Sequence, residues 1–403
     1  FYSPALQGSD IQLLNVDSVQ ILKGPQGTLF GRNTNGGAIQ VNTAEPNQKT
    51  RFIGEAGYGS YDAFRMQAYG NLALDEGTSL DMAVSYATGD GYTTNIANGD
   101  DKIGKYRNIS IRTALKVDLT DRFSVLARYA HSDLDDPTNL FQVPYVMNGK
   151  VASQLAGQPG AIVTTKSKQV SADEDIYYRF KSDSYQFKAA YDFDDFSVTS
   201  YTQWRKDRQY HARYSFDYTN LPGLAIDIPD YNNTFTQELL LTSKAGPRLQ
   251  YTIGAFYFNA DQSFPGVALA SGNNPFAFSS ASGVRNKSIA GYADLTYDFG
   301  GGFFLTGGLR YTRDTVNDAY YTVGAARTTT TLPQLKTSRL TPRLVARYEF
   351  TPDTNIYASY SRGYKAAIYN VGGLVNDVIK PEELDAFEVG IKHAAGGLRA
   401  NIA

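Results

Sequence analysis

Apolar and polar residues alternate along most of the chain from residue 51 onward. In residues 108–119 (NISIRTALKVDL) every second residue from Ile109 is apolar except Thr113, and the intervening residues are mostly charged or polar. The same period of two recurs in residues 184–193 and 343–350. This period predicts β-strands whose two faces meet different surroundings. The segments run about ten residues or longer, enough for a tilted strand to cross a hydrocarbon core, whereas strands of a soluble sandwich average about five or six.

The connections between these segments alternate between short and long. Tight turns are expected at 75–77, 120–121, 194–195, 245–247, 300–301, 352–353 and 396–397, and long loops at 89–105, 134–182, 208–232, 261–286, 314–337 and 366–382. Outer-membrane barrels have short periplasmic turns and long external loops. The pattern therefore predicts an all-β fold, an antiparallel up-and-down transmembrane β-barrel, of which about 14–15 strands lie in this chain, the last beginning at Leu398.

Composition excludes several other classes. The 403 residues include 30 Tyr, 22 Phe, no Cys and a net charge of −2, and no run of 18 apolar residues occurs. The sequence therefore predicts no transmembrane helix and gives no electrostatic case for a nucleic-acid partner. His131, His211 and His393 are far apart and lack the spacing of metal ligands. We predict no catalytic residues, no metal site and no cofactor, and hence no enzyme.

Residues 1–50 depart from the barrel pattern. They contain an apolar VQIL segment, a dense set of glycines and a second strand-like segment, AIQVNT. Such a glycine density indicates tight turns in a compact plug rather than a membrane strand. The stretch GPQGTLFGRN lacks the Lys-Ser/Thr ending of a phosphate loop and the spacing of a dinucleotide motif. We therefore divide the chain into the C-terminal part of a plug domain, 1–50, and an incomplete transmembrane barrel, 51–403.

The stretch from Val19 to Pro46, VQILKGPQGTLFGRNTNGGAIQVNTAEP, closely resembles the end of the plug of TonB-dependent outer-membrane receptors. SYSRGYK at 359–365 and FEVGIK at 387–392 resemble weaker barrel signatures of the same family. The resemblance implies a full-length barrel of about 22 strands with a plugged lumen. It also implies that the TonB box and the first part of the plug precede Phe1. Because a closed barrel needs an even number of strands, we expect further strands after Ala403.

The same resemblance suggests residues that hold the plug in the barrel. Lys23 occupies the place of an arginine in the family motif, and Lys23 and Glu388 match a plug–barrel ion pair of the family. Arg32 is a second plug cation that is expected to find a barrel carboxylate. The plug motif itself comprises Gly24, Pro25, Gly27, Gly31, Gly36 and Gly37.

The resemblance implies TonB-dependent active import of a scarce ligand across the outer membrane of a Gram-negative bacterium, with a ferric siderophore as the commonest cargo. The expected partners are membrane lipid and lipopolysaccharide, the TonB–ExbB–ExbD complex and a small extracellular ligand, and the protein is expected to be a monomer. A passive diffusion porin, or a family receptor for haem, cobalamin or carbohydrate, is the alternative. The candidate ligand-binding residues are aromatic or imidazole side chains of the long loops: Phe141, Tyr145, Tyr177, Tyr178, Tyr210, His211, Tyr214, Tyr320 and Tyr321.

Overall fold

A computed structural model describes residues 15–137, 146–147, 150–151, 157–173, 175–215, 218–222, 224–246, 248–271, 274–323, 328–370 and 377–403. Strands make up 74% of the structure, and no α-helix is present among the described residues. The strands are β1 Val16–Lys23, β2 Gly37–Thr43, β3 Arg51–Gly59, β4 Ala63–Asp75, β5 Thr78–Gly89, β6 Thr93–Asn95, β7 Asp100–Ile103, β8 Tyr106–Thr120, β9 Phe123–Asp135, β10 Val146–Met147, β11 Lys150–Val151, β12 Gln169–Val170, β13 Tyr177–Asp192, β14 Phe196–Ser215, β15 Leu224–Asp227, β16 Asp230–Ser243, β17 Leu249–Ser271, β18 Asn274–Gly300, β19 Phe303–Val323, β20 Thr328–Thr331, β21 Leu335–Thr351, β22 Thr354–Lys365, β23 Ile368–Tyr369, β24 Val378–Ile379, β25 Glu382–Ala395 and β26 Leu398–Ile402.

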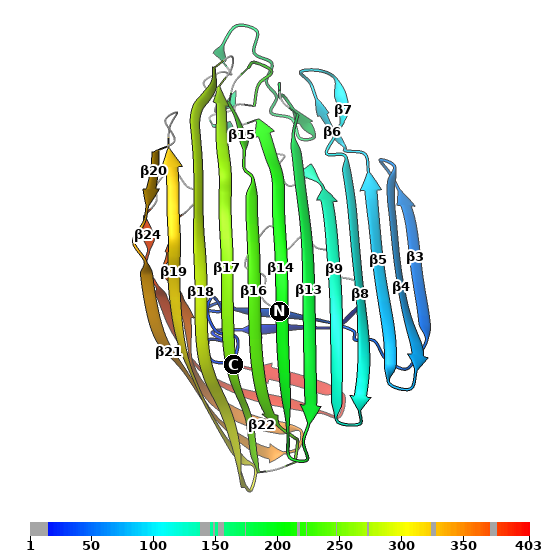
Figure 1. Ribbon diagram of the computed structural model, residues 1–403, viewed down its shortest axis with the longest axis vertical. Helices are drawn as coiled ribbons and strands as arrows, with labels where there is room; N and C mark the ends of the chain where they lie inside the picture. Colours follow the sequence, from blue (N-terminus) through cyan, green and yellow to red (C-terminus); the bar gives the residue numbers. More distant parts are fainter. Residues whose placement is uncertain are drawn as a thin grey trace.

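The long strands form one antiparallel sheet that curves into the wall of a barrel (Figure 1). From β3 the order is β3, β4, β5, β8, β9, β13, β14, β16, β17, β18, β19, β21, β22, β25 and β26, with short β15 and β20 pairing at the rim. Each strand in this order is hydrogen-bonded to the next, from β3 to β26. Among the described residues no ladder joins β26 to β3, so the wall is curved but not closed. The predicted all-β, up-and-down barrel architecture is confirmed.

The two faces of the wall differ as the alternation predicts. In β8, Ala114 is 1% exposed whereas its neighbour Leu115 is 40% exposed. In β25, Phe387 and Val389 are among the most exposed apolar residues of the chain. The inner face contacts the N-terminal hairpin, as where Arg128 of β9 donates to Thr43. The outer face is therefore apolar and available to lipid, and the inner face is polar.

Two belts of aromatic side chains lie on the outer face. Near the short turns, the ring centroids of Tyr191 and Phe193 are 4.6 Å apart, as are those of Phe193 and Phe196. Further along the strands, away from the short turns, the ring of Tyr185 lies 5.9 Å from that of Trp204. We call this second group the upper belt. Tyr185 and Phe193 are eight residues apart in sequence, or about 27 Å of extended strand. A spacing of this size suits the two girdles that border the apolar band of an outer-membrane barrel.

The predicted long loops at 208–232, 261–286 and 314–337 are shorter than expected, and this part of the prediction is wrong. Paired strands extend through most of these ranges, because β17 continues to Ser271 and β18 begins at Asn274. Beyond the upper belt both faces of a strand can meet water, so its outer residues no longer need to be apolar. The period of two then disappears from the sequence although the backbone ladder continues. No helix in the described part of the chain is long and apolar enough to cross a membrane.

The N-terminal segment forms a separate two-stranded hairpin, β1–β2. Figure 1 shows this hairpin lying across the direction of the wall strands, at the level of the barrel. The two segments expected to be strands, VQIL and AIQVNT, are the two arms of the hairpin. The glycine-rich residues between them form its tip.

A pair of arginine substitutions tests the assignment of the faces. Leu344 is exposed on the outer face of β21, and Ser359 borders a hollow of about 290 Å³ on the inner side, in register with Glu388. Leu344→Arg should cost on the order of 2–4 kcal/mol near the bilayer midplane, whereas Ser359→Arg should cost far less. Unfolding of the full-length protein from lipid bilayers measures both, and equal costs would contradict the assignment.

Candidate functional site: the plug docking seam

The tip of the β1–β2 hairpin is a compact loop, residues 24–36. The Phe30 N–H donates to the Gln26 carbonyl at 3.0 Å, and the Gln26 N–H donates to the Thr34 carbonyl at 3.1 Å. Gly31 has a φ of 79°, a conformation that an L side chain rarely adopts. The glycines thus allow a loop with its own internal hydrogen bonds to form at the end of the hairpin.

The loop docks against the wall where β21 and β22 separate. Pairing between these two strands ends at Arg343 and Ser361, although each strand continues beyond that point. There β21 remains paired with β19, and β22 remains paired with β25. We call the gap between residues 335–342 of β21 and residues 362–365 of β22 the seam. Its strand edges carry backbone groups that the missing β21–β22 ladder does not satisfy.

The plug loop supplies hydrogen-bond partners at both edges of the seam. The Thr28 hydroxyl donates to the Thr341 carbonyl at 2.9 Å, and the Thr341 hydroxyl donates to the Gly27 carbonyl at 3.1 Å. On the other edge, the Asn33 N–H donates to the Tyr364 carbonyl at 2.9 Å. The loop therefore fills part of the gap with polar contacts.

Two glycines of the loop permit this close approach. A Cβ at Gly27 would lie 2.4 Å from the backbone oxygen of Arg362, and one at Gly31 would lie 2.8 Å from Nη2 of Arg310. Both distances are shorter than a carbon atom tolerates. Gly27 and Gly31 are thus the motif glycines at which plug backbone approaches the wall closely.

Gly27→Ala should therefore displace the plug loop from the seam. We expect a cost of about 1–3 kcal/mol, the usual size of an overpacking penalty. Gly36→Ala is the matched control, because a Cβ there would meet no heavy atom within 4 Å and Gly36 is not among the positive-φ glycines. Protease susceptibility of the plug in the folded full-length protein measures both, and equal susceptibility would contradict the docked arrangement.

A buried charged group fastens the loop to β19. Nη1 of Arg32 lies 3.0 Å from Oδ1 of Asp314, and the two side chains are only 12% and 3% exposed. The hydroxyl of Tyr364 donates to the other oxygen of Asp314 at 3.0 Å. The Arg32 guanidinium also lies 5.1 Å from the ring centroid of the buried Phe258. The carboxylate thus accepts from both plug and wall, which couples the position of Arg32 to that of Tyr364.

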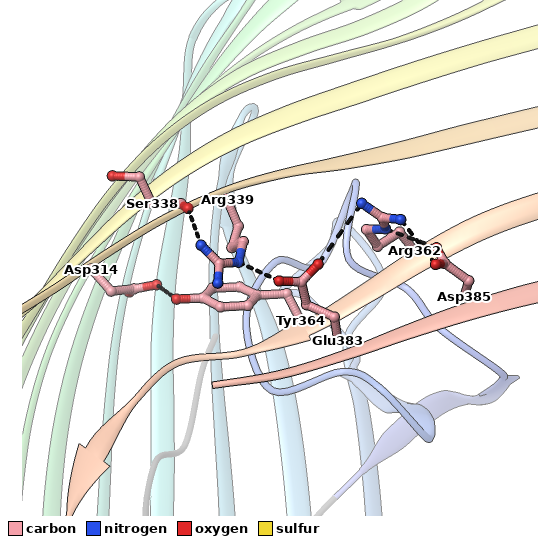
Figure 2. A network of polar contacts seen from close by, with 7 residues as sticks. All are labelled: Asp314, Ser338, Arg339, Arg362, Tyr364, Glu383 and Asp385. Atoms are coloured by element: carbon pink, nitrogen blue, oxygen red, sulfur yellow. Dashed lines mark hydrogen bonds and ion pairs between the residues drawn. The ribbon is translucent and has the colours of Figure 1, made fainter. Parts of the chain in front are cut away.

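Side chains bridge the seam where the backbone ladder is absent (Figure 2). Arg339 of β21 donates to Glu383 of β25 at 2.5 Å, and Arg362 of β22 contacts the other oxygen of Glu383 at 3.8 Å. Arg362 also forms a two-point contact with Asp385, at 2.7 and 2.9 Å. These side chains are about one-third to two-fifths exposed, so each pair adds little stability alone. Of these contacts, the Arg339–Glu383 pair crosses the seam and joins β21 to β25 without backbone pairing. Arg362 and Asp385 are direct partners in the β22–β25 ladder.

The end of the plug is anchored at a second place, on β9 and β13. Arg128 donates to the Thr43 hydroxyl at 3.1 Å and to the Ala44 carbonyl at 3.2 Å. Lys188 lies 2.9 Å from Glu45. The seam and this second contact involve different strands of the wall, so the hairpin is held at both its tip and its C-terminal end.

The structure shows an ion pair for one of the two predicted plug cations, Arg32, and none for Lys23 among the described residues. Arg32 pairs with a barrel carboxylate, Asp314, as the hypothesis for this residue requires. Among the ion pairs of the described residues, none joins Lys23 to Glu388. Glu388 instead accepts a hydrogen bond from the Tyr357 hydroxyl at 2.6 Å, and Lys23 ends β1. The motif residues all lie in or next to the tip loop: Gly24, Pro25, Gly27, Gly31, Gly36 and Gly37.

The structure does not gather the candidate ligand-binding residues around one described cavity. Phe141 and Tyr145 lie outside the described residues, and the side chains of His211 and Tyr214 are likewise outside the described part. The other five lie on β13, β14 and β19: Tyr177, Tyr178, Tyr210, Tyr320 and Tyr321. Tyr210 borders a hollow on the outer face of the wall rather than the lumen.

No group of three or more His, Asp or Glu side chains suited to a metal ion occurs in the part of the chain that the structure describes. The described imidazoles have other contacts. Nδ1 of His131 lies 2.8 Å from Asp183, and Nδ1 of His393 lies 2.8 Å from the Thr354 hydroxyl.

The wall matches a known protein family. A family model described as "TonB dependent receptor-like, beta-barrel" matches residues 128–403. The chain therefore belongs to the TonB-dependent receptor family, and the predicted resemblance is confirmed.

Individual relatives match nearly all of this chain but are longer than it. The chain is 25% identical to the pesticin receptor of Yersinia enterocolitica over 399 residues, which covers 97% of this chain and 56% of that protein. The chain thus spans just over half the length of this curated relative. The solved ferric yersiniabactin uptake receptor FyuA of Yersinia pestis superposes with a TM-score of 0.81 at 21% identity, covering 95% of this chain and 58% of that one. The siderophore receptor PiuA of Acinetobacter baumannii gives 0.73 at 18% identity, covering 94% and 60%.

Proposed function

We propose that the protein is an outer-membrane active transporter in which a plug, held in the barrel by polar contacts, is displaced to admit a scarce ligand. The observation that carries the proposal is the seam, where a buried ion pair and backbone hydrogen bonds fix a glycine-rich loop to the wall. Such contacts can be exchanged for water, whereas an apolar plug surface would resist exposure. A plug of this kind can move without losing its own fold.

The proposed cargo is a ferric siderophore. Solved structures that share this fold include a ferric yersiniabactin uptake receptor and a siderophore receptor. A cobalamin cargo is the main alternative, because the vitamin B12 transporter BtuB of Vibrio vulnificus is 25% identical over 111 residues, 27% of this chain and 18% of that protein. Haem and carbohydrate are the other cargo alternatives.

The proposal also covers location, partners and domains. The barrel, residues 51–403, lies in the outer membrane of a Gram-negative bacterium in contact with lipid and lipopolysaccharide, and residues 1–50 are the end of the plug. Energy comes from the TonB–ExbB–ExbD complex. The protein acts as a monomer and as a carrier rather than an enzyme, and extracellular aromatic residues contact the ligand.

Uptake in iron-limited cells tests the function. Cells that lack other siderophore receptors and express the full-length protein are given a ferric siderophore labelled with radioactive iron. The label should accumulate only with expression, and collapse of the inner-membrane proton gradient should abolish accumulation. Uptake that persists without the gradient would favour a passive diffusion porin. Accumulation of labelled cobalamin instead would replace the cargo and retain the transport mechanism.

A further inference from the structure

The outer face of β8, β9, β13 and β14 carries a charged hollow just beyond the upper aromatic belt. The belt here consists of Tyr129, Tyr185 and Trp204, with ring centroids 5.1 and 5.9 Å apart. Along β13, Lys181 and Arg179 follow Tyr185 on the same face, in the direction away from the short turns. The hollow thus lies where the apolar band of the wall ends and the polar zone outside it begins.

The hollow is open and has a volume of about 500 Å³. Six side chains line it: Arg107, Asp133, Asp135, Arg179, Lys181 and Tyr210. Nε of Arg179 lies 3.3 Å from Asp135, and Nζ of Lys181 lies 3.0 Å from Asp133. The cationic side chains remain 56% and 44% exposed. Because a guanidinium has five N–H donors and an ammonium three, each cation keeps donors free for a second anion.

Basic side chains outnumber acidic ones around the hollow. Arg107 is exposed and forms no ion pair with another described residue. The face also carries Lys206, whose ammonium lies 4.1 Å from the ring centroid of Trp204, and Arg208. Five basic residues thus face three acidic ones, Asp133, Asp135 and Asp183, on a chain whose net charge is −2. This local excess of positive charge favours an anionic occupant.

We propose that this hollow binds the phosphorylated headgroup of an outer-leaflet glycolipid. The position sets the class of ligand, because a molecule with its acyl chains against Phe187 and the aromatic belt places its headgroup at the height of Lys181 and Arg179. The chemistry agrees, because guanidinium groups bind phosphate through two parallel hydrogen bonds. Asp133 and Asp135 hold the cations in place until phosphate oxygens replace them. The inference rests on the outer-membrane location proposed above.

Binding of defined lipids to the purified full-length protein tests the site. The probes are lipid A with two phosphates, its monophosphoryl form and its dephosphorylated form, each in the same detergent. The triple variant Arg107→Gln/Arg179→Gln/Lys181→Gln should weaken binding of diphosphoryl lipid A on the order of tenfold or more. The control triple, Arg285→Gln/Lys287→Gln/Arg313→Gln, removes the same charge from the outer face of β18 and β19 and should change it less than about twofold.

Several results would overturn the proposal. Equal losses in the two triple variants would mean that the lipid responds only to net charge. Equal affinity for the phosphorylated and dephosphorylated lipids would exclude phosphate recognition, and full displacement of lipid A by millimolar inorganic phosphate would indicate a simple anion site. Uptake of the labelled ferric siderophore is measured in parallel. If the unsubstituted protein imports the siderophore normally but does not prefer phosphorylated lipid, this inference alone is overturned. If it prefers phosphorylated lipid but imports no siderophore, the proposed function alone is overturned.

Discussion

Replacing Arg32 with alanine is expected to weaken docking of the plug by about 3–5 kcal/mol. The substitution leaves the Asp314 carboxylate buried and without its cation, and breaking a buried pair in this way is costly because the remaining charge stays desolvated. Release of the plug from the wall of the full-length protein should therefore need much less urea, as followed by a fluorophore on the plug.

Arg65→Ala is the matched control for this experiment. Arg65 pairs with Glu55 at 2.9 Å, a similar distance, but the two side chains are 60% and 64% exposed. An exposed pair is worth at most about 1 kcal/mol. If Arg32→Ala and Arg65→Ala shift the transition equally, the Arg32–Asp314 pair does not fasten the plug. Recovery of docking in the double variant Arg32→Met/Asp314→Leu would support the desolvation argument.

Removal of the plug should convert a closed barrel into an ion-conducting one. Barrels of this family's size enclose a lumen that only a folded plug blocks. Deleting the plug of the full-length protein through residue 50 leaves the apolar outer face unchanged, so the barrel should still insert into planar bilayers. We expect large, stable conductance from the deletion variant and almost none from the intact protein or from Gly36→Ala. Free conductance by the intact protein, unchanged by the deletion, would favour the porin.

The wall of the barrel could be predicted from sequence because lipid imposes a local rule. A strand in the apolar band must place an apolar side chain on every second position, and residues 108–119 follow this rule almost without exception. The rule applies only to the part of each strand that lies in the apolar band. In β17 and β18 the strands continue to Ser271 and from Asn274, where Ser, Gly, Asn and Ala occur on either face and the sequence resembles a loop.

The docking site could be predicted only on the plug side. The glycines and Arg32 are close together in sequence and form a recognisable motif. Their partners are not, because Asp314 is 282 residues from Arg32 and Thr341 is 313 residues from Thr28. An acidic residue on a polar strand face looks the same whether it meets water or a plug. Only the fold shows that Asp314 is buried and that the β21–β22 ladder stops beside it.

The ion pair expected between Lys23 and Glu388 is not among those of the described residues. Family resemblance places Lys23 and Glu388 together, and the structure pairs the Glu388 carboxylate with the Tyr357 hydroxyl. Lysine offers a point charge where arginine offers a planar fork, so it does not hold a carboxylate in the same geometry. In this chain Arg32, in the tip loop of the hairpin, forms the buried plug–barrel ion pair with Asp314.

Entry of the ligand should require the plug to leave the seam. The chain has no native cysteine, so Thr28→Cys and Thr341→Cys, at two residues joined by a hydrogen bond, can be bridged by a short cross-linker with a reducible disulfide. Each single cysteine variant, treated in the same way, controls for the chemistry. The cross-linked protein should bind the labelled ferric siderophore at the cell surface but import almost none, and reduction should restore import. Import at the normal rate with the cross-link intact would contradict the account.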